Sequence, residues 1–130
     1  MNYYIATTVA QPFDDVVSEV IERLRAAGFG VLTDIDVRAA LQSKIGVEMA
    51  RYRILGACDP SLAHEALKIE DKLGVLLPCN IIVHETPDRR VEVASVDPVA
   101  ALERTGNPAL ARIALEIRGR LARVVDAVAS

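Results

Sequence analysis

The stretch from Gly74 to Val96, GVLLPCNIIVHETPDRRVEVASV, decides the fold. An apolar run opens it, an alternating apolar–polar run closes it, and TPDRR between them has the composition of a tight turn. We therefore expect an antiparallel hairpin whose first strand, Gly74–Glu85, is apolar on both faces and lies centrally in a sheet. Pro78 interrupts this strand, and because proline has no N–H to donate, we expect a bulge, a bend or a sheet edge there.

Three strand–helix pairs precede the hairpin. β-Branched, aromatic and aliphatic residues predict strands at 2–10, 29–35 and 51–57. Helical spacing and helix-start signals predict helices at 12–28, 36–46 and 59–69, with Asp36 and Asp59 as N-caps and Pro60 in the first helical position. After the hairpin, a long helix is expected to begin at Asn107 and to present one apolar stripe, made of Leu110, Ile113, Ile117, Leu121, Val124 and Val128. The order β-α-β-α-β-α-β-β-α predicts an α+β fold of two layers, with helices packed on one mixed or mainly antiparallel sheet.

Composition places the chain among globular proteins. Its 130 residues fit one domain, 1–130, and 52% hydrophobic with 25% charged residues can build a core. A net charge of −3 and an aromatic content of 4% disfavour nucleic-acid binding. The N-terminal sequence has no signal-peptide pattern, and no apolar run approaches the roughly 18–20 residues that span a bilayer. We therefore expect a cytoplasmic protein without a membrane segment.

The two cysteines, Cys58 and Cys79, are expected as free thiols in a reducing compartment. Cys58 ends an apolar run directly before the predicted helix start at Asp59. Free N–H groups at a helix start lower a thiol pKa, whereas the Asp59 charge and the apolar approach raise it. The alternative for both cysteines is a structural role, because free cysteine is among the most frequently buried residues.

Both cysteines flank the helix predicted at 59–69, so one end of the sheet can bring them together. Two thiolates and His64, on the intervening helix, are the candidate ligands of a soft metal such as Zn²⁺ or Cu(I). The spacing is not that of a CxxC pair, and a surface position is the alternative for His64. Asp36 and Arg53 are candidates for the polar rim of a ligand site. A helix cap and a solvated strand face explain these two residues equally well.

Four motifs, TDIDVRAALQSKIG, YRILGACDP, GVLLPCNIIV and SVDPVAAL, resemble those of the domain of unknown function 302 family. The resemblance covers nearly the whole chain and implies a compact fold of the TATA-binding-protein-like type and a homodimer. It implies no activity, and the name of the fold does not imply DNA binding. The motif positions that carry over are Asp36, Cys58, Asp59, Pro60, Pro78, Cys79, Asn80, Asp97 and Pro98. Other members carry a glycine in place of Cys58 and an aliphatic residue in place of Cys79, so the thiols are not required for the fold.

We therefore expect a cytoplasmic homodimeric module that binds a small ligand or a soft metal near Cys58 and Cys79, with Asp36 and Arg53 as its polar rim. The alternative is a structural or regulatory protein-interaction domain without a small-molecule site. A thiol-dependent enzyme is the third hypothesis.

Overall fold

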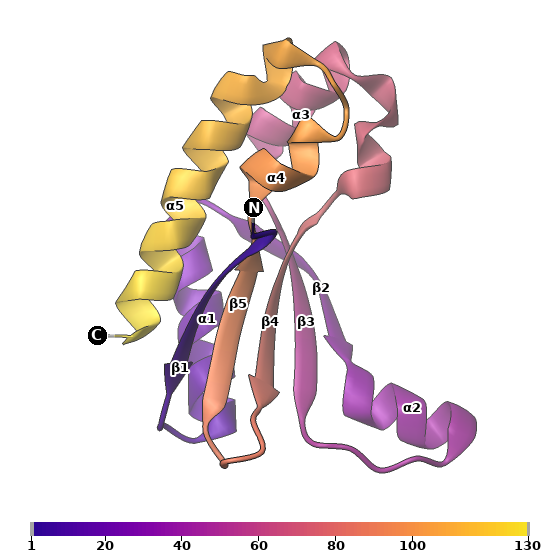
Figure 1. The fold of residues 1–130 in the computed structure, drawn as a ribbon, viewed down its shortest axis with the longest axis vertical. Coiled ribbons are helices and arrows are strands. Elements are labelled where there is room, and N and C mark those ends of the chain that lie inside the picture. Colours follow the sequence, from indigo (N-terminus) through magenta and orange to yellow (C-terminus); the bar gives the residue numbers. More distant parts are fainter. Residues whose placement is uncertain (1, 130) are drawn as a thin grey trace.

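A computed structural model describes residues 2–129 (Figure 1). Its strands are β1 (Tyr4–Val9), β2 (Gly30–Asp36), β3 (Tyr52–Cys58), β4 (Cys79–Glu85) and β5 (Val91–Val96). Its α-helices are α1 (Phe13–Ala26), α2 (Val37–Ile45), α3 (Pro60–Ile69), α4 (Pro98–Glu103) and α5 (Ala111–Ala129). Two 3₁₀-helices, η1 (Asp71–Leu76) and η2 (Pro108–Leu110), complete the order.

The five strands form one sheet in the order β1-β5-β4-β3-β2, and all neighbouring strands are antiparallel. The expected hairpin of β4 and β5 is present, and β4 is the middle strand of the sheet. This position explains the composition of the strand, since Cys79, Ile81 and Val83 are buried on its helix-covered face. The predicted α+β class with a mainly antiparallel sheet is confirmed, whereas the TATA-binding-protein-like type stays a prediction.

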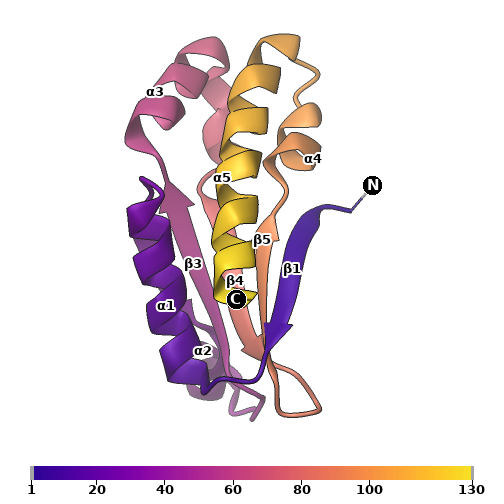
Figure 2. The same cartoon turned by 90° about the vertical axis from the view of Figure 1, so that its left-hand side faces the viewer.

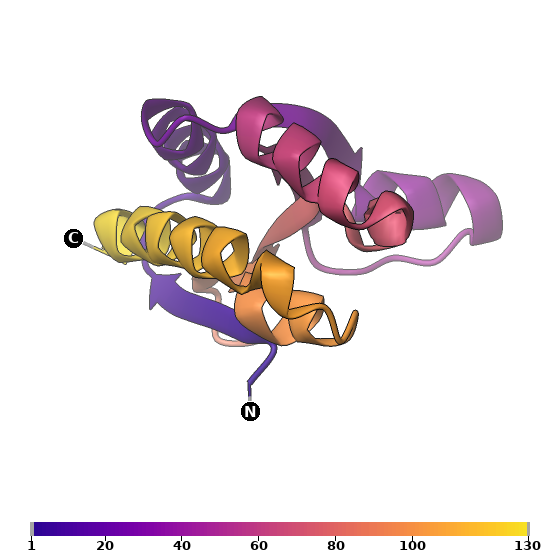
Figure 3. The ribbon, with the colours of Figure 1, turned by 90° about the horizontal axis from the view of Figure 1, so that it is seen from above.

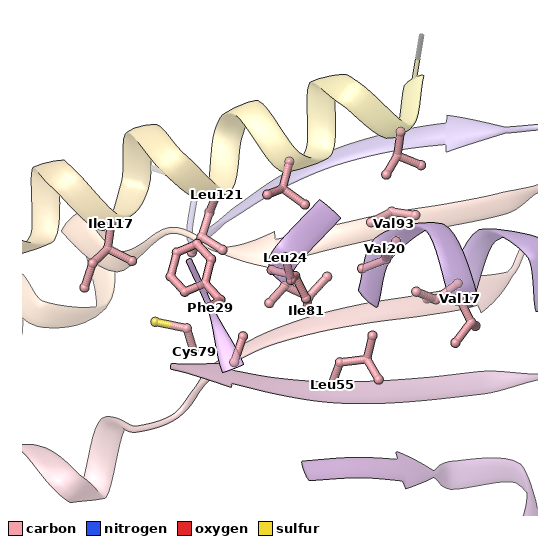
Figure 4. Close-up of a cluster of buried hydrophobic side chains, with 14 of the residues drawn as sticks. Val17, Val20, Leu24, Phe29, Leu55, Cys79, Ile81, Val93, Ile117 and Leu121 are labelled. Atoms are coloured by element: carbon pink, nitrogen blue, oxygen red, sulfur yellow. The ribbon is translucent and has the colours of Figure 1, made fainter. Parts of the chain in front are cut away.

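Helices α1 and α5 cover one face of the sheet (Figure 2). Their buried stripes meet the inward side chains of the central strands, and Figure 4 shows Leu24 and Leu121 packed over Ile81. All three side chains are fully buried. The opposite face carries no helix among the described residues, and in Figure 1 it lies in front of α1. None of the helices within residues 2–129 is long and apolar enough to cross a membrane.

The structure departs from the predicted order in two regions, before β4 and after β5. The strand expected to begin at Gly74 begins at Cys79, because residues 71–76 form η1 and the proline that lacks an N–H precedes the strand instead of interrupting it. The bulge of the sheet lies instead in β2, between Val31 and Thr33. Helix α4 was absent from the predicted order, although Asp97 caps it through the N–H of Val99.

Candidate functional site

A cavity of about 330 Å³ lies at the end of the sheet where β3 and β5 finish and β4 starts. Figure 1 shows α3, η1 and α4 gathered beyond these strand ends, at the top of the molecule, and Figure 3 shows α3 lying opposite α4 and the start of α5. The short helices therefore form walls around the sheet end, and α5 closes one side.

The lining of this cavity is mainly aliphatic. It includes Leu62, Ala63 and Ala66 of α3, Leu73, Val75 and Leu76 of η1, Ala101 and Leu102 of α4, and Ile113 and Ile117 of α5. The polar contributions come from Asp59, Asn80 and the two thiols. Leu73 and Leu102 are buried, whereas Val75 is 86% exposed, so η1 forms a thin outer wall with apolar side chains on both sides.

Two aspartates fix the helices that form the walls. Asp59 caps α3 by accepting from the N–H of Leu62 at 3.0 Å, and its other oxygen accepts from Nη1 of Arg120 at 2.8 Å. Asp97 caps α4 in the same way, and its Oδ2 accepts from Nε of Arg118 at 3.0 Å. Each aspartate therefore ties the start of one short helix to α5.

Arg120 also joins the site to the core. Its Nε donates to the carbonyl oxygen of Ala27 at 3.1 Å, and its guanidinium lies 4.6 Å from the centroid of the Phe29 ring. Only 16% of this side chain is exposed, so its charge is partly desolvated and compensated by Asp59. The sequence prediction missed Arg118 and Arg120 of α5, since their positions off the apolar stripe are also those of ordinary surface residues.

The structure brings the two predicted thiols to this cavity. Both line it, and the neighbour of Cys58 on β3, Ala57, pairs with Cys79 on β4. Figure 4 shows Cys79 at one end of the buried cluster, beside Phe29, with its sulfur directed away from Ile81. Both cysteines are free.

Both thiols are held in the protonated form at neutral pH. Burial, and secondly the charge of Asp59, raise the pKa of Cys58 above its ordinary value. Burial, and secondly the proximity of Cys58, raise the pKa of Cys79 to about 11. The helix start therefore does not make Cys58 an acidic thiol, because burial and the charge of Asp59 both raise its pKa.

The other candidate ligands do not join the thiols. His64 is exposed on α3, and no group of three His, Cys, Asp or Glu side chains within residues 2–129 is arranged to hold a metal ion. The expected set of Cys58, Cys79 and His64 is therefore not assembled within one chain.

Asp36 and Arg53 lie at the opposite end of the sheet. They pair with each other in the β2–β3 register, five residues along β3 from Cys58, which is about 17 Å in an extended strand. Asp36 caps α2 through the N–H of Ala39, as predicted. Arg53 makes a two-pronged ion pair with Asp34, whose carboxyl pKa it lowers. These residues therefore form no rim around the thiols.

Fold and cavity together define a class: a small α+β domain whose short helices enclose an apolar cavity at the end of an antiparallel sheet. The chain belongs to the family described as Domain of unknown function DUF302, whose profile matches residues 5–128. The family resemblance read from the sequence is thereby confirmed. The crystal structure of an uncharacterized conserved protein DUF302 from Bacillus stearothermophilus is similar, with 27% identity, a TM-score of 0.90, and 97% of this chain and 98% of that chain covered. No protein of curated function matches the sequence.

Proposed function

We propose that this protein binds a small, uncharged and mainly apolar ligand in the cavity enclosed by α3, η1, α4 and α5. The observation that carries the proposal is the volume of about 330 Å³ that remains open beside a closely packed core. This volume lies at the lower end of the range of small-molecule sites, which are mostly apolar with a few polar groups.

The charges around the cavity support an uncharged ligand. Asp59 is the charged residue of the lining, and its carboxylate is already bound to Leu62 and Arg120. The thiols of Cys58 and Cys79 are neutral at pH 7 because their pKa values are raised. Neither an anion nor a cation would therefore gain a free counter-charge in the cavity.

Neutral thiols are better suited to packing against a bound ligand than to acting as catalytic nucleophiles. A thiol that stays protonated is a poor nucleophile, whereas its polarizable sulfur packs well against apolar and aromatic groups. In this proposal Cys58 and Cys79 line the bound ligand, with no covalent step. The proposed compartment is the cytoplasm, where two thiols stay reduced. The proposed binding unit is a homodimer.

Titration with N-phenyl-1-naphthylamine, an uncharged dye that fluoresces in apolar surroundings, tests the proposal. The wild-type protein should enhance its fluorescence saturably, and Ala66→Leu, which fills the cavity from α3, should abolish the effect. Ala26→Leu makes the same change at an exposed position of α1 and should bind like the wild type. Equal enhancement by all three proteins would show that the dye binds elsewhere, and the absence of enhancement by the wild type would favour a protein-interaction domain without a small-molecule site.

A further inference from the structure

The helix-free face of the sheet, here called the bare face, carries a continuous apolar row. The row crosses all five strands through the directly paired residues Ala6, Ala94, Ile82, Ile54 and Ile35. Paired residues of antiparallel strands project to the same side. Ile54 and Ile82 lie in the middle of this row, and Ile35 at its end is 48% exposed.

On either side of this apolar row, the outward-facing residues of the bare face are aromatic and polar, with little charge. Glu92 pairs with His84, and His84 pairs with Tyr52 in the strand register. Nε2 of His84 lies 2.7 Å from Oε1 of Glu92, and the Tyr52 ring lies 5.1 Å from the imidazole. Glu92 and His84 are the acid and the base among the outward-facing strand residues, and their side chains bind each other. Tyr4, 42% exposed, adds another aromatic side chain.

The flat area of the bare face comes close to the smallest area that a specific dimer buries. Strands about 4.8 Å apart with a rise of about 3.3 Å per residue give five strands a flat footprint of about 480 Å² per copy. Two such footprints total about 960 Å² before the relief of the side chains is counted, and specific interfaces begin near 1,000 Å².

We propose that the bare face packs against the bare face of a second copy of this chain, related by a two-fold axis. This rests on the homodimer of the proposed function and names its surface. Two apolar rows then meet in one interface core, in the manner of two sheets about 10 Å apart. Because Glu92 contacts His84 of its own copy, the two-fold brings no carboxylate without a partner against its own image.

Edge strand β2 is poorly suited to pairing with a strand of another chain, which favours the face-to-face arrangement. That edge strand carries the bulge at residues 31–33 and the acidic side chains of Asp34 and Asp36. Bulges and charges are the usual protection of an edge against pairing with another chain. Nothing comparable protects the bare face, where the central row has no charged residue.

Size-exclusion chromatography with light scattering on the full chain tests the surface. The wild type should have twice the 14.1 kDa mass of one chain, and Ile82→Lys should have the mass of one chain. Leu115→Lys introduces the same charge at a 63% exposed leucine of α5 and should remain a dimer. Ile35→Lys lies at the exposed end of the row, where the fold tolerates lysine, and should weaken the dimer if Ile82→Lys does not fold.

The possible results test the proposed dimer surface separately from the homodimer and from ligand binding. A dimer that persists in both row variants would overturn the proposed surface and leave the homodimer standing. A monomeric wild type would overturn both, and the bare face would then belong to a different partner. Dye binding in a monomeric variant would show that the ligand proposal holds independently of the dimer.

Discussion

The substitution Ala66→Leu fills the cavity, and its effect on the free energy of unfolding distinguishes an open cavity from a closely packed core. The protein gains stability if the cavity is open and loses stability if the core is packed. Ala66 lies on α3, lines the cavity and is 3% exposed, so an added side chain points into the space beside the core. In a closely packed core the same substitution would be overpacking, which costs about 1–3 kcal/mol.

The expected gain follows from the added carbon atoms. Leucine brings three more carbons than alanine, and at about 0.8 kcal/mol for each buried group they contribute roughly 2.4 kcal/mol. Loss of side-chain freedom subtracts about 0.5–1 kcal/mol. We therefore expect Ala66→Leu to stabilise the protein by about 1–2 kcal/mol.

Urea unfolding followed by circular dichroism measures this change. The urea midpoint should rise while the slope stays constant. Ala26→Leu on the exposed side of α1 should leave the free energy of unfolding within about 0.5 kcal/mol of wild type. A loss of stability in Ala66→Leu, with unchanged Ala26→Leu, would show that the space is too narrow to hold three carbons and would refute the open cavity.

Three further changes test the site and its supports. Because the pKa of Cys79 rises from 9.0 to about 11 on folding, its thiol favours the folded state below pH 9. Urea unfolding should therefore show wild type losing up to roughly 3 kcal/mol relative to Cys79→Ala as the pH rises from about 9 to about 11; parallel pH profiles would contradict the burial. A Cβ on Gly56 would lie 2.2 Å from Oγ1 of Thr33 and 2.7 Å from Cγ of Pro78, so Gly56→Ala should cost about 1–3 kcal/mol in the same assay. Gly74→Ala meets no atom within 4 Å and should stay within about 1 kcal/mol of wild type, and equal effects of the two would contradict the packing over β3. Asp59→Ala removes both the cap of α3 and the partner of Arg120, and it should lower the free energy of unfolding by about 2–4 kcal/mol. Asp59→Asn keeps an acceptor for the cap and should cost less. A larger loss in Asp59→Asn would be inconsistent with capping.

Much of the local structure could be predicted from sequence because its causes lie within a few residues. Asp36 and Asp59 each accept from an N–H three residues on, which is the relation that a cap prediction uses. The turn at residues 86–90 joins two strands that pair directly, so the hairpin was also visible in the sequence. The 3₁₀-helix η1 was missed, because Val75 and Leu76 continue an apolar run that also fits a strand.

The composition of the site depended on distances that the sequence does not contain. Cys58 and Cys79 were expected together because both flank α3, and they do line one cavity. Asp36 and Arg53 were grouped with them by chemical type, although the β2–β3 register places them at the far end of the sheet. Arg120 reaches Asp59 across 61 positions, and no local pattern marks such a contact.

A ¹⁵N NMR titration with N-phenyl-1-naphthylamine tests the central claim most directly, because it locates the bound dye on the chain. We expect saturable shifts of the amides of Cys58, Leu73 and Cys79, which surround the cavity from three elements, and the loss of these shifts in Ala66→Leu. Shifts confined to Ile54 and Ile82 on the bare face, or no saturable shift at all, would contradict the assignment of the cavity as the ligand site.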